Sequence, residues 1–235
     1  MSQPDQETTL VTGASRGIGR HLVKHFLAQG HFVIGCSRSE GDLTDPAYTH
    51  FVCDVSDETK VKEVLSLVRK KHGRLDNLIN NAGIASMNHS LTTPLTSIRE
   101  ILETNFVGTF LFCREAAKLM QRRKFGRIVN FTTIAVPLRL PGETAYASSK
   151  AAVEMLTRIL AFEYAPYSIT VNALGPGPVA TALLRNVPET TVRELMNRQA
   201  VKRMVELEDV TNVVDFFLRP ASGMVTGQVL YLGGL

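Results

Sequence analysis

Short runs of apolar residues alternate along the chain with longer segments in which apolar residues recur every three or four positions. The short runs predict strands and the longer segments predict helices. We expect strands at residues 8–14, 31–38, 49–56, 75–83, 126–133, 168–177 and 226–234. We expect helices at residues 19–30, 58–73, within 97–124 and at 144–165, and a last helix before the final strand.

This alternation also predicts the fold class. Strands rich in valine and isoleucine that alternate with helices are typical of a parallel sheet covered by helices on both faces. No change of composition and no internal repeat divides the 235 residues. The sequence therefore predicts one doubly wound, Rossmann-like α/β domain over residues 1–235, with a polar and mobile start at residues 1–7.

Composition and charge narrow the class of protein. The chain is 44% hydrophobic and 20% charged, and its net charge of +4 comes from scattered basic residues. A nucleic-acid binder more often carries a basic stripe, so we expect no nucleic-acid partner. The one dense basic run, at residues 121–127, is interpreted as a solvated helix end.

The cysteines and the absence of long apolar runs bear on the compartment. Cys36, Cys53 and Cys113 are far apart in apolar segments, and their odd number does not suit a disulfide framework. We interpret them as buried thiols in a reducing compartment. Neither a secretory signal nor an apolar run of transmembrane length occurs, so we expect a cytoplasmic protein without a membrane partner.

We expect no metal site. His21 and His25 lie four residues apart on the first predicted helix, which is a spacing that can hold a metal. The predicted helix carries neither a carboxylate nor a third histidine, so the sequence favours a solvated helix face at these two positions.

A glycine-rich turn, "TGASRGIG", stands between the first strand and the first helix. Gly13, Gly17 and Gly19 permit a tight turn and let backbone amides approach a pyrophosphate, which the helix N-terminus then stabilises. Their order differs from the general dinucleotide pattern G-x-G-x-x-G. An ordinary tight turn is the alternative, but the position between strand and helix favours phosphate binding.

The end of the second strand indicates which dinucleotide binds. An NAD site tends to have an acidic residue there, whereas an arginine accommodates the additional phosphate of NADP. This chain has Ser37 and Arg38, with Arg38 nineteen residues after Gly19, and Arg16 inside the glycine turn adds a second guanidinium. Guanidinium groups suit phosphates, so we predict NADP(H) as the cofactor. Alternatively, Arg38 is an ordinary surface arginine.

A tyrosine and a lysine on the long helix at 144–165 suggest acid–base chemistry at a carbonyl. Tyr146 and Lys150 are four residues apart and share a helix face. A free tyrosine has a pKa of about 10, and a neighbouring ammonium favours the phenolate and lowers that pKa. The spacing is too common to identify a site by itself, so the pair depends on its context.

The motifs together supply that context. Six motifs, in their order along the chain, resemble those of the classical short-chain dehydrogenase/reductase family, and the resemblance covers essentially the whole chain. They are "TGASRGIG", "NNAG" at residues 80–83, "ETNFVGTF" with Asn105, "YASSK", "PGPVAT" and "TGQVLYLGG". The chain looks most like the 3-oxoacyl-(acyl carrier protein) reductase-like members. The resemblance implies NADPH-dependent reduction of a ketone to a secondary alcohol, with a 3-oxoacyl thioester of fatty acid biosynthesis as the preferred substrate.

The resemblance also implies partners and leaves alternatives. Acyl carrier protein is an expected partner, and the family's habit implies a homotetramer formed through the helices around Asn105 and Tyr146. One alternative is a reductase of free ketones, such as a steroid, sugar or xenobiotic carbonyl. The other is an NADP(H)-binding sensor or structural partner without turnover.

The roles of single residues follow from the same resemblance. Tyr146 would donate a proton to the carbonyl oxygen, and Lys150 would lower the pKa of Tyr146 and hold the nicotinamide ribose. Asn105 would hold, through its backbone, a water that relays protons to Lys150. The residues expected at the cofactor are Gly13, Ser15, Arg16, Gly17, Ile18, Gly19, Ser37, Arg38, Asp54 and Val55 (adenine), Asn81, Ala82 and Gly83 (adenosine ribose), Tyr146, Lys150, Pro176, Gly177, and Val179 and Thr181 (carboxamide).

The chain departs from the family pattern at the catalytic serine, whose position falls on Thr133. Threonine keeps a hydroxyl that donates and accepts hydrogen bonds, so carbonyl polarisation is retained. Its methyl group stiffens χ1 and takes up space beside the substrate. We therefore expect an active enzyme with Thr133 in the serine's place; Thr132 is the alternative if the register differs by one residue.

Three further segments carry expectations. The stretch between Arg38 and Asp54 is too short for the usual helix, so we expect a more open adenine end. "YLGGL" lacks the aspartate that often precedes the final glycines. Residues 182–204 are expected to form a mobile substrate lid, whose Arg185, Arg193 and Arg198 either meet an acidic carrier or phosphate or face solvent.

Overall fold

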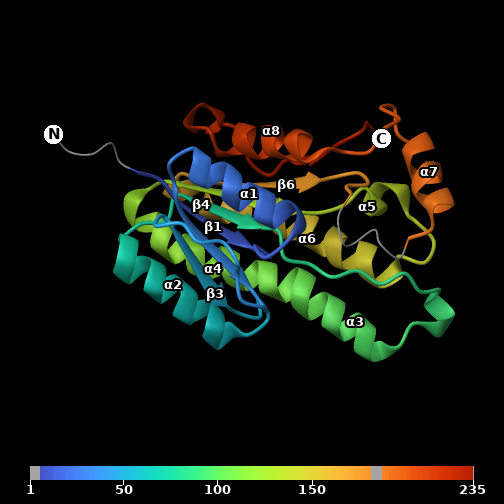
Figure 1. Ribbon diagram of the computed structural model, residues 1–235, viewed down its shortest axis with the longest axis horizontal. Coiled ribbons are helices and arrows are strands. Elements are labelled where there is room, and N and C mark those ends of the chain that lie inside the picture. The colour runs from blue at the N-terminus through green and yellow to red at the C-terminus, as the bar shows by residue number, and fades with distance from the viewer. Residues whose placement is uncertain (1–5, 181–186, 235) are drawn as a thin grey trace.

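One parallel sheet forms the centre of the protein. The computed structural model describes residues 6–180 and 187–234, and in this part of the chain seven strands lie in the order β3-β2-β1-β4-β5-β6-β7 (Figure 1). Every neighbouring pair is parallel. The strands are β1 (Thr8–Thr12), β2 (Phe32–Ser37), β3 (Tyr48–Val52), β4 (Asn77–Asn80), β5 (Gly126–Phe131), β6 (Ile169–Gly175) and β7 (Val229–Tyr231).

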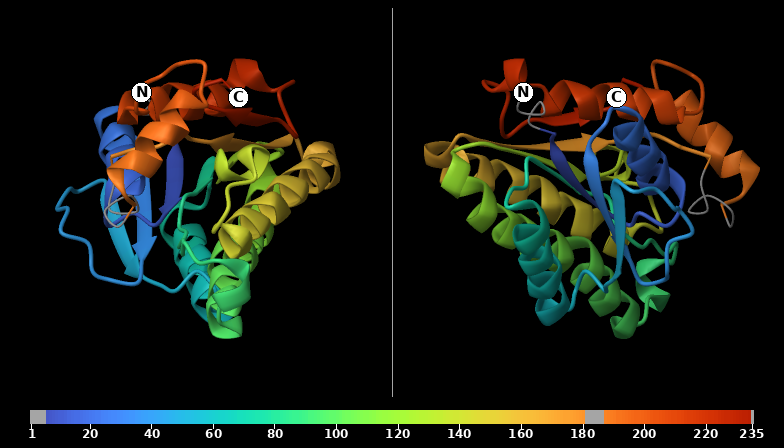
Figure 2. Two further views of the ribbon diagram at one scale, coloured as in Figure 1. Left: turned by 90° about the vertical axis from the view of Figure 1, so that its right-hand side faces the viewer. Right: turned by 60° about the vertical axis from the view of Figure 1, so that its left-hand side comes forward.

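Helices cover both faces of this sheet, because its strands present apolar side chains on both. Helices α1 (Gly17–Ala28) and α8 (Leu207–Leu218) pack on one face around Val11 and Val129. Helices α2 (Glu58–His72), α4 (Gly108–Met120) and α6 (Thr144–Tyr164) pack on the other around Leu10 and Ile128. Figure 2 shows the sheet between these two layers. The doubly wound α/β fold predicted from the sequence is confirmed.

The remaining helical elements connect this framework. They are α3 (Leu95–Leu102), α5 (Ala135–Leu138), α7 (Glu189–Asn197), the π-helix η2 (Glu103–Val107) and the 3-10 turns η1 (Ser90–Thr92), η3 (Gln121–Arg123), η4 (Ala165–Tyr167) and η6 (Pro220–Ser222). The segment 97–124, expected to contain helix, consists of α3, η2, α4 and η3. Between β2 and β3 a loop replaces the usual helix, as the sequence predicted.

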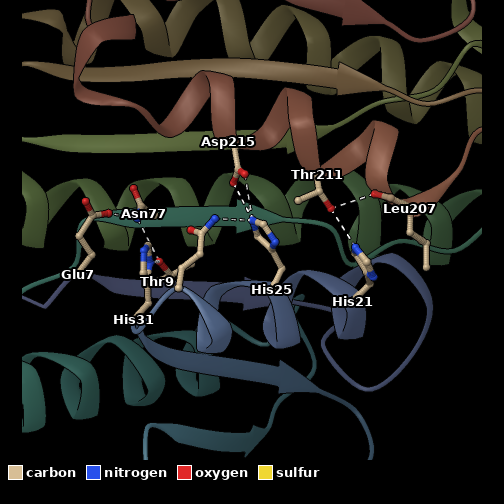
Figure 3. Close-up of polar contacts among 10 residues, drawn as sticks. Glu7, Thr9, His21, His25, His31, Asn77, Leu207, Thr211 and Asp215 are labelled. Atoms are coloured by element: carbon tan, nitrogen blue, oxygen red, sulfur yellow. Dashed lines mark hydrogen bonds and ion pairs between the residues drawn. The ribbon is translucent and has the colours of Figure 1, made fainter.

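A transverse row of buried polar residues crosses the sheet near its amino edge. Thr9, Asn77, Arg127 and Thr170 are in-register partners on β1, β4, β5 and β6, and all four side chains are buried. The amide of Asn77 donates to Glu7 Oε2 at 2.8 Å and to Thr9 Oγ1 at 3.1 Å (Figure 3). Arg127 stands inside the basic run that was interpreted as solvated, and that interpretation is wrong for this residue.

The two histidines of α1 lie at the interface with α8 rather than on a solvated face. His21 Nε2 is 3.0 Å from Thr211 Oγ1, and His25 Nε2 is 3.0 Å from both carboxylate oxygens of Asp215 (Figure 3). The interpretation of these positions as a solvated face is therefore wrong, because α8 packs against them. The sequence pattern around α1 could not indicate this contact, since the partner residues lie 190 residues further along the chain. Within residues 6–180 and 187–234, no group of three or more His, Cys, Asp or Glu side chains is placed to hold a metal.

Two observations bear on the expectations about compartment and membrane. Cys36, Cys53 and Cys113 are buried free thiols. No helix in the described part of the chain is long and apolar enough to cross a membrane.

Candidate active site

A cleft of about 1140 Å³ opens along the carboxyl edge of the sheet, where loops follow every central strand. The residues expected at the cofactor or the reacting carbonyl gather around it, although they are spread over more than 160 positions of the sequence. Gly19 and Asn105 lie behind its wall, and Thr181 lies outside the described residues. The expected residues that line the cleft are Gly13, Ser15, Arg16, Gly17, Ile18, Ser37, Arg38, Asp54, Val55, Asn81, Ala82, Gly83, Thr133, Tyr146, Lys150, Pro176, Gly177 and Val179.

The glycine turn has the conformation that a phosphate cradle requires. Gly13 has φ +69° and Gly17 has φ +55°, a backbone region that favours glycine. Helix α1 begins at Gly17, and a Cβ on Gly19 would lie 2.2 Å from the carbonyl oxygen of Gly13. The first turn of the helix therefore packs directly on the preceding loop. Gly17 and Ile18 of this turn line the cleft, and the Arg16 side chain, just before the helix, makes no capping hydrogen bond to its amide groups.

The "NNAG" loop is fastened to this turn through Thr12, which the sequence reasoning missed. Thr12 Oγ1 accepts hydrogen bonds from the amides of Asn81 and Ala82, at 3.1 and 3.0 Å. The Asn81 side chain donates to the carbonyl oxygens of Thr12 and Gly13. Asn81 thus holds two adjacent loops in place, and the backbone of Ala82 and Gly83 is left to line the cleft.

Positive charge gathers at the end of the cleft beside β2. Arg16 and Arg38 are exposed and line the cleft. Burial acts to raise the pKa of Asp54, but hydrogen bonds from Ser56 and the charge of Arg38 outweigh it and lower that pKa. The charge of Arg38 therefore acts across the region expected to hold the adenosine.

Two details at this end of the cleft were not predicted. The Ser37 hydroxyl donates to the Ser39 carbonyl oxygen at 2.7 Å, so it has a partner within the protein. A third guanidinium, from Arg20 on α1, also lines the cleft and pairs with Asp42 at 2.7 Å. No local sequence signal pairs Arg20 with Asp42, because the two meet only when the loop after β2 folds back onto α1.

Tyr146 and Lys150 lie on the first turns of α6 and face the cleft. Burial raises the pKa of Tyr146 to about 12, while a hydrogen bond with the Thr133 side chain acts to lower it. Thr133 Oγ1 also accepts from the Ala135 amide at 3.2 Å. Burial lowers the pKa of Lys150 to about 8, and its Nζ donates to the Phe131 carbonyl oxygen at 2.8 Å. Thr133, rather than Thr132, is therefore the hydroxyl beside Tyr146, since Thr132 Oγ1 donates to Glu154.

Asn105 stands at the π-helix η2 and is completely buried. Its side chain accepts from the Ile84 amide and donates to the Ile84 carbonyl oxygen and to Ser149 Oγ, each at 2.9 Å. A Cβ on Gly83 would lie 3.2 Å from Asn105 Oδ1 and 3.3 Å from Lys150 Nζ. These contacts bring α6, η2 and the "NNAG" loop together at one point beside Lys150.

The substrate side of the cleft is walled by the loop before α6 and by α7. Apolar side chains of Leu140, Pro141 and Leu195 line it together with Glu143 and Arg198. The Arg198 guanidinium donates to the Leu138 carbonyl oxygen at 3.0 Å. Of the expected lid at 182–204, residues 182–186, with Arg185, lie outside the described residues.

The residues of the cleft fit NADP(H). The positive-φ glycines and the open N-terminus of α1 suit a pyrophosphate, and the guanidinium groups of Arg16 and Arg38 suit the additional ribose phosphate. Lys150 and Tyr146 lie further along the same cleft, where the nicotinamide end would meet a carbonyl substrate.

Comparisons with known proteins agree with this geometry. The profile of the Enoyl-(Acyl carrier protein) reductase family matches residues 13–234. The 3-oxoacyl-[acyl-carrier-protein] reductase FabG of Haemophilus influenzae is 30% identical over 231 residues, which cover 96% of each protein. Among solved structures, ElxO with NADP bound has a TM-score of 0.89 at 29% identity and covers 97% of both chains. Levodione reductase has a TM-score of 0.90 at 26% identity, with 98% and 96% covered.

The predicted cofactor, NADP(H), is thus the one bound in a solved structure that this chain resembles over almost its whole length. The full-length matches also cover every motif on which the resemblance was based. The chain belongs to the short-chain dehydrogenase/reductase family of NAD(P)(H)-dependent oxidoreductases.

Proposed function

We propose that the protein reduces a ketone to a secondary alcohol with NADPH, and that a 3-oxoacyl thioester is its preferred substrate. The observation that carries this proposal is the arrangement of Thr133, Tyr146 and Lys150 at the cleft, where Thr133 acts to lower the pKa of Tyr146. The 3-oxoacyl-[acyl-carrier-protein] reductase among the relatives supports the thioester as substrate.

The proposed chemistry assigns a role to each of these side chains. When bound, the reduced cofactor supplies the hydride that the carbonyl carbon accepts. Tyr146 gives its phenolic proton to the carbonyl oxygen, and the Thr133 hydroxyl donates to that oxygen or to the phenolate that remains. Lys150, charged at neutral pH because its pKa is about 8, stabilises the phenolate. Asn105 is proposed to hold a water at its backbone, through which Lys150 passes a proton back to Tyr146.

NADPH oxidation with three substrates tests this function. The purified protein is assayed with acetoacetyl-coenzyme A, with a free ketone and with the unsaturated thioester crotonyl-coenzyme A. Turnover of the first supports the proposal. Turnover of the free ketone alone favours the alternative, a reductase of free ketones; levodione reductase is among the structurally similar proteins. NADPH binding without any turnover would identify a sensor or structural partner, and reduction of the crotonyl thioester alone would assign the reaction to a carbon–carbon double bond.

We further propose a homo-oligomer, with a tetramer as the expected form. On α6, Met155, Ile159 and Phe162 are 55%, 49% and 84% exposed at helical spacing, and the neighbouring α3 exposes Leu95 and Leu102. Several large apolar side chains exposed on two neighbouring helices favour contact with another protein surface. Light scattering tests this proposal, and Phe162→Glu is expected to lower the measured mass while a monomeric wild type would contradict it.

The proposed location is the cytoplasm, on the grounds that three buried thiols stay free and that the relatives include an acyl-carrier-protein enzyme. Acyl carrier protein is the proposed carrier of the substrate. A comparison of kcat/KM between acetoacetyl-acyl carrier protein and acetoacetyl-coenzyme A checks the second point, since a carrier-specific enzyme is expected to prefer the former.

A further inference from the structure

Glu143, the residue before α6, has an unpartnered carboxyl oxygen inside the cleft. Its Oε2 atom is buried, and no residue in the described part of the chain makes a hydrogen bond to it. Glu143 stands at the N-cap position of α6, but its side chain makes no capping hydrogen bond there. The carboxyl group therefore has no visible role in holding the helix.

The surroundings of Glu143 point toward the substrate. The group lines the cleft together with Leu140, Pro141 and Met87, and its charge acts on Tyr146. The backbone of the loop before it is fixed, because the Asn88 amide donates to the Gly142 carbonyl oxygen at 2.9 Å. The loop thus holds Glu143 beside the group that protonates the substrate.

Charged groups on the neighbouring elements leave Glu143 uncompensated. Arg198, at the end of α7, donates to the Leu138 carbonyl oxygen, and Glu194 on α7 carries a like charge. Glu143 is half-buried, and burial of its carboxyl group disfavours the charged form and so raises the pKa of Glu143. A neutral carboxyl group has one O–H to donate.

Glu143 and Tyr146 line the same cleft and lie close enough for the charge of Glu143 to act on the phenol. In a 3-oxoacyl thioester a single methylene separates the ketone from the thioester carbonyl. A substrate of this kind offers one oxygen to Tyr146 and a second, neighbouring oxygen to Glu143.

We infer that Glu143 selects the substrate class, an inference that rests on the proposed function. Its carboxyl group donates a hydrogen bond to a second carbonyl oxygen of the substrate, and one methylene separates that carbonyl group from the ketone that Tyr146 protonates. Glu143 is then a specificity-determining contact for 3-oxoacyl thioesters and other β-dicarbonyl compounds. A ketone without the second carbonyl leaves the carboxyl group unpartnered in the complex and binds less well.

The test compares two substrates across a small set of variants of the full-length protein. Glu143→Leu removes the hydrogen-bonding group, Glu143→Gln keeps a donor of similar size, and Glu163→Leu makes the same change at an exposed position of the same helix. Each variant is assayed with NADPH and either acetoacetyl-coenzyme A or a simple ketone of matched carbon number. Thermal melting and NADPH titration confirm that each variant folds and binds the cofactor; Glu143→Ala replaces Glu143→Leu if the latter does not fold.

The expected result is a change in selectivity. Glu143→Leu lowers the ratio of kcat/KM for the thioester to kcat/KM for the simple ketone by about tenfold, mainly through KM, consistent with one lost hydrogen bond. Glu143→Gln restores most of the ratio, and Glu163→Leu leaves it at the wild-type value. If Glu143→Leu lowers kcat/KM equally for both substrates, or if Glu143→Gln is as impaired as Glu143→Leu, the inference is wrong while the proposed function still stands. A wild type that turns over neither substrate would refute the proposed function, and the inference with it.

Discussion

The Thr133 side chain lies beside the phenol of Tyr146 in the cleft, and its interaction with that phenol opposes the effect of burial on the pKa of Tyr146. The hydroxyl therefore favours the phenolate that forms when Tyr146 gives up its proton. We therefore expect threonine to perform here the task of a serine, since its extra methyl group leaves the hydroxyl beside the phenol.

Thr133→Val is expected to lower kcat by well over tenfold while NADPH affinity is retained. Valine has the same shape but cannot hydrogen-bond, so the pKa of Tyr146 rises further and the carbonyl oxygen loses a donor. Steady-state kinetics and fluorescence titration with NADPH measure the two effects. Thr133→Ser is the matched control and is expected to stay within about threefold of wild type, since one serine hydroxyl replaces the lost group. An unchanged rate in Thr133→Val would contradict the role of this hydroxyl.

Lys150→Met is expected to abolish turnover and yet to stabilise the cofactor-free protein at pH 7, by about 1–2 kcal/mol. Burial lowers the folded-state pKa of Lys150 from 10.5 to about 8, so the unfolded chain binds more protons between these two values. Below pH 8 the charged group carries its full desolvation cost, and wild-type stability recovers part of that cost as pH rises from 8 toward 10.5. The stability gap between Lys150→Met and wild type should therefore narrow between pH 7 and pH 9.5. Thermal melts at both pH values check this, with the exposed Lys118→Met as control.

Arg38→Leu is expected to change cofactor preference. Loss of a guanidinium beside the ribose phosphate should raise the KM for NADPH by about ten- to hundredfold, whereas the KM for NADH changes little. The ratio of kcat/KM for the two cofactors is the measurement. Arg69→Leu, on the exposed side of α2, removes the same charge away from the cleft and should leave the ratio unchanged. Equal effects on both cofactors would show that Arg38 does not contact the phosphate.

His25→Leu is expected to destabilise the protein by about 1–2 kcal/mol, because it breaks the contact with Asp215 that joins α1 to α8. Added Zn²⁺ should not raise the melting temperature of wild type, since the partners of His21 and His25 are side chains of α8. Chemical denaturation of wild type, His25→Leu and the exposed control His89→Leu measures the first effect. A zinc-dependent rise in melting temperature would reverse the assignment.

The fold was predictable because each strand is a short apolar run and each helix a periodic one. The cleft positions of Gly13, Tyr146 and Lys150 were predictable from the set of motifs that resembles a known family, and the carboxyl edge of a parallel sheet brings such motifs together. The histidine contacts could not be predicted from the sequence, because His25 and Asp215 are 190 residues apart. Glu143 gave no signal either, since a glutamate before a helix is common and only its buried, unpaired oxygen distinguishes it.

The polar row formed by Thr9, Asn77, Arg127 and Thr170 has a consequence for how the sheet assembles. A slip of one residue between any two of these strands would place a polar or charged side chain on the opposite, apolar face of the sheet. The row therefore penalises misaligned pairings at the amino edge. With alignment fixed there, the loops of the carboxyl edge can change in sequence without shifting the strands that carry them, which is a physical reason why one framework accommodates different substrates.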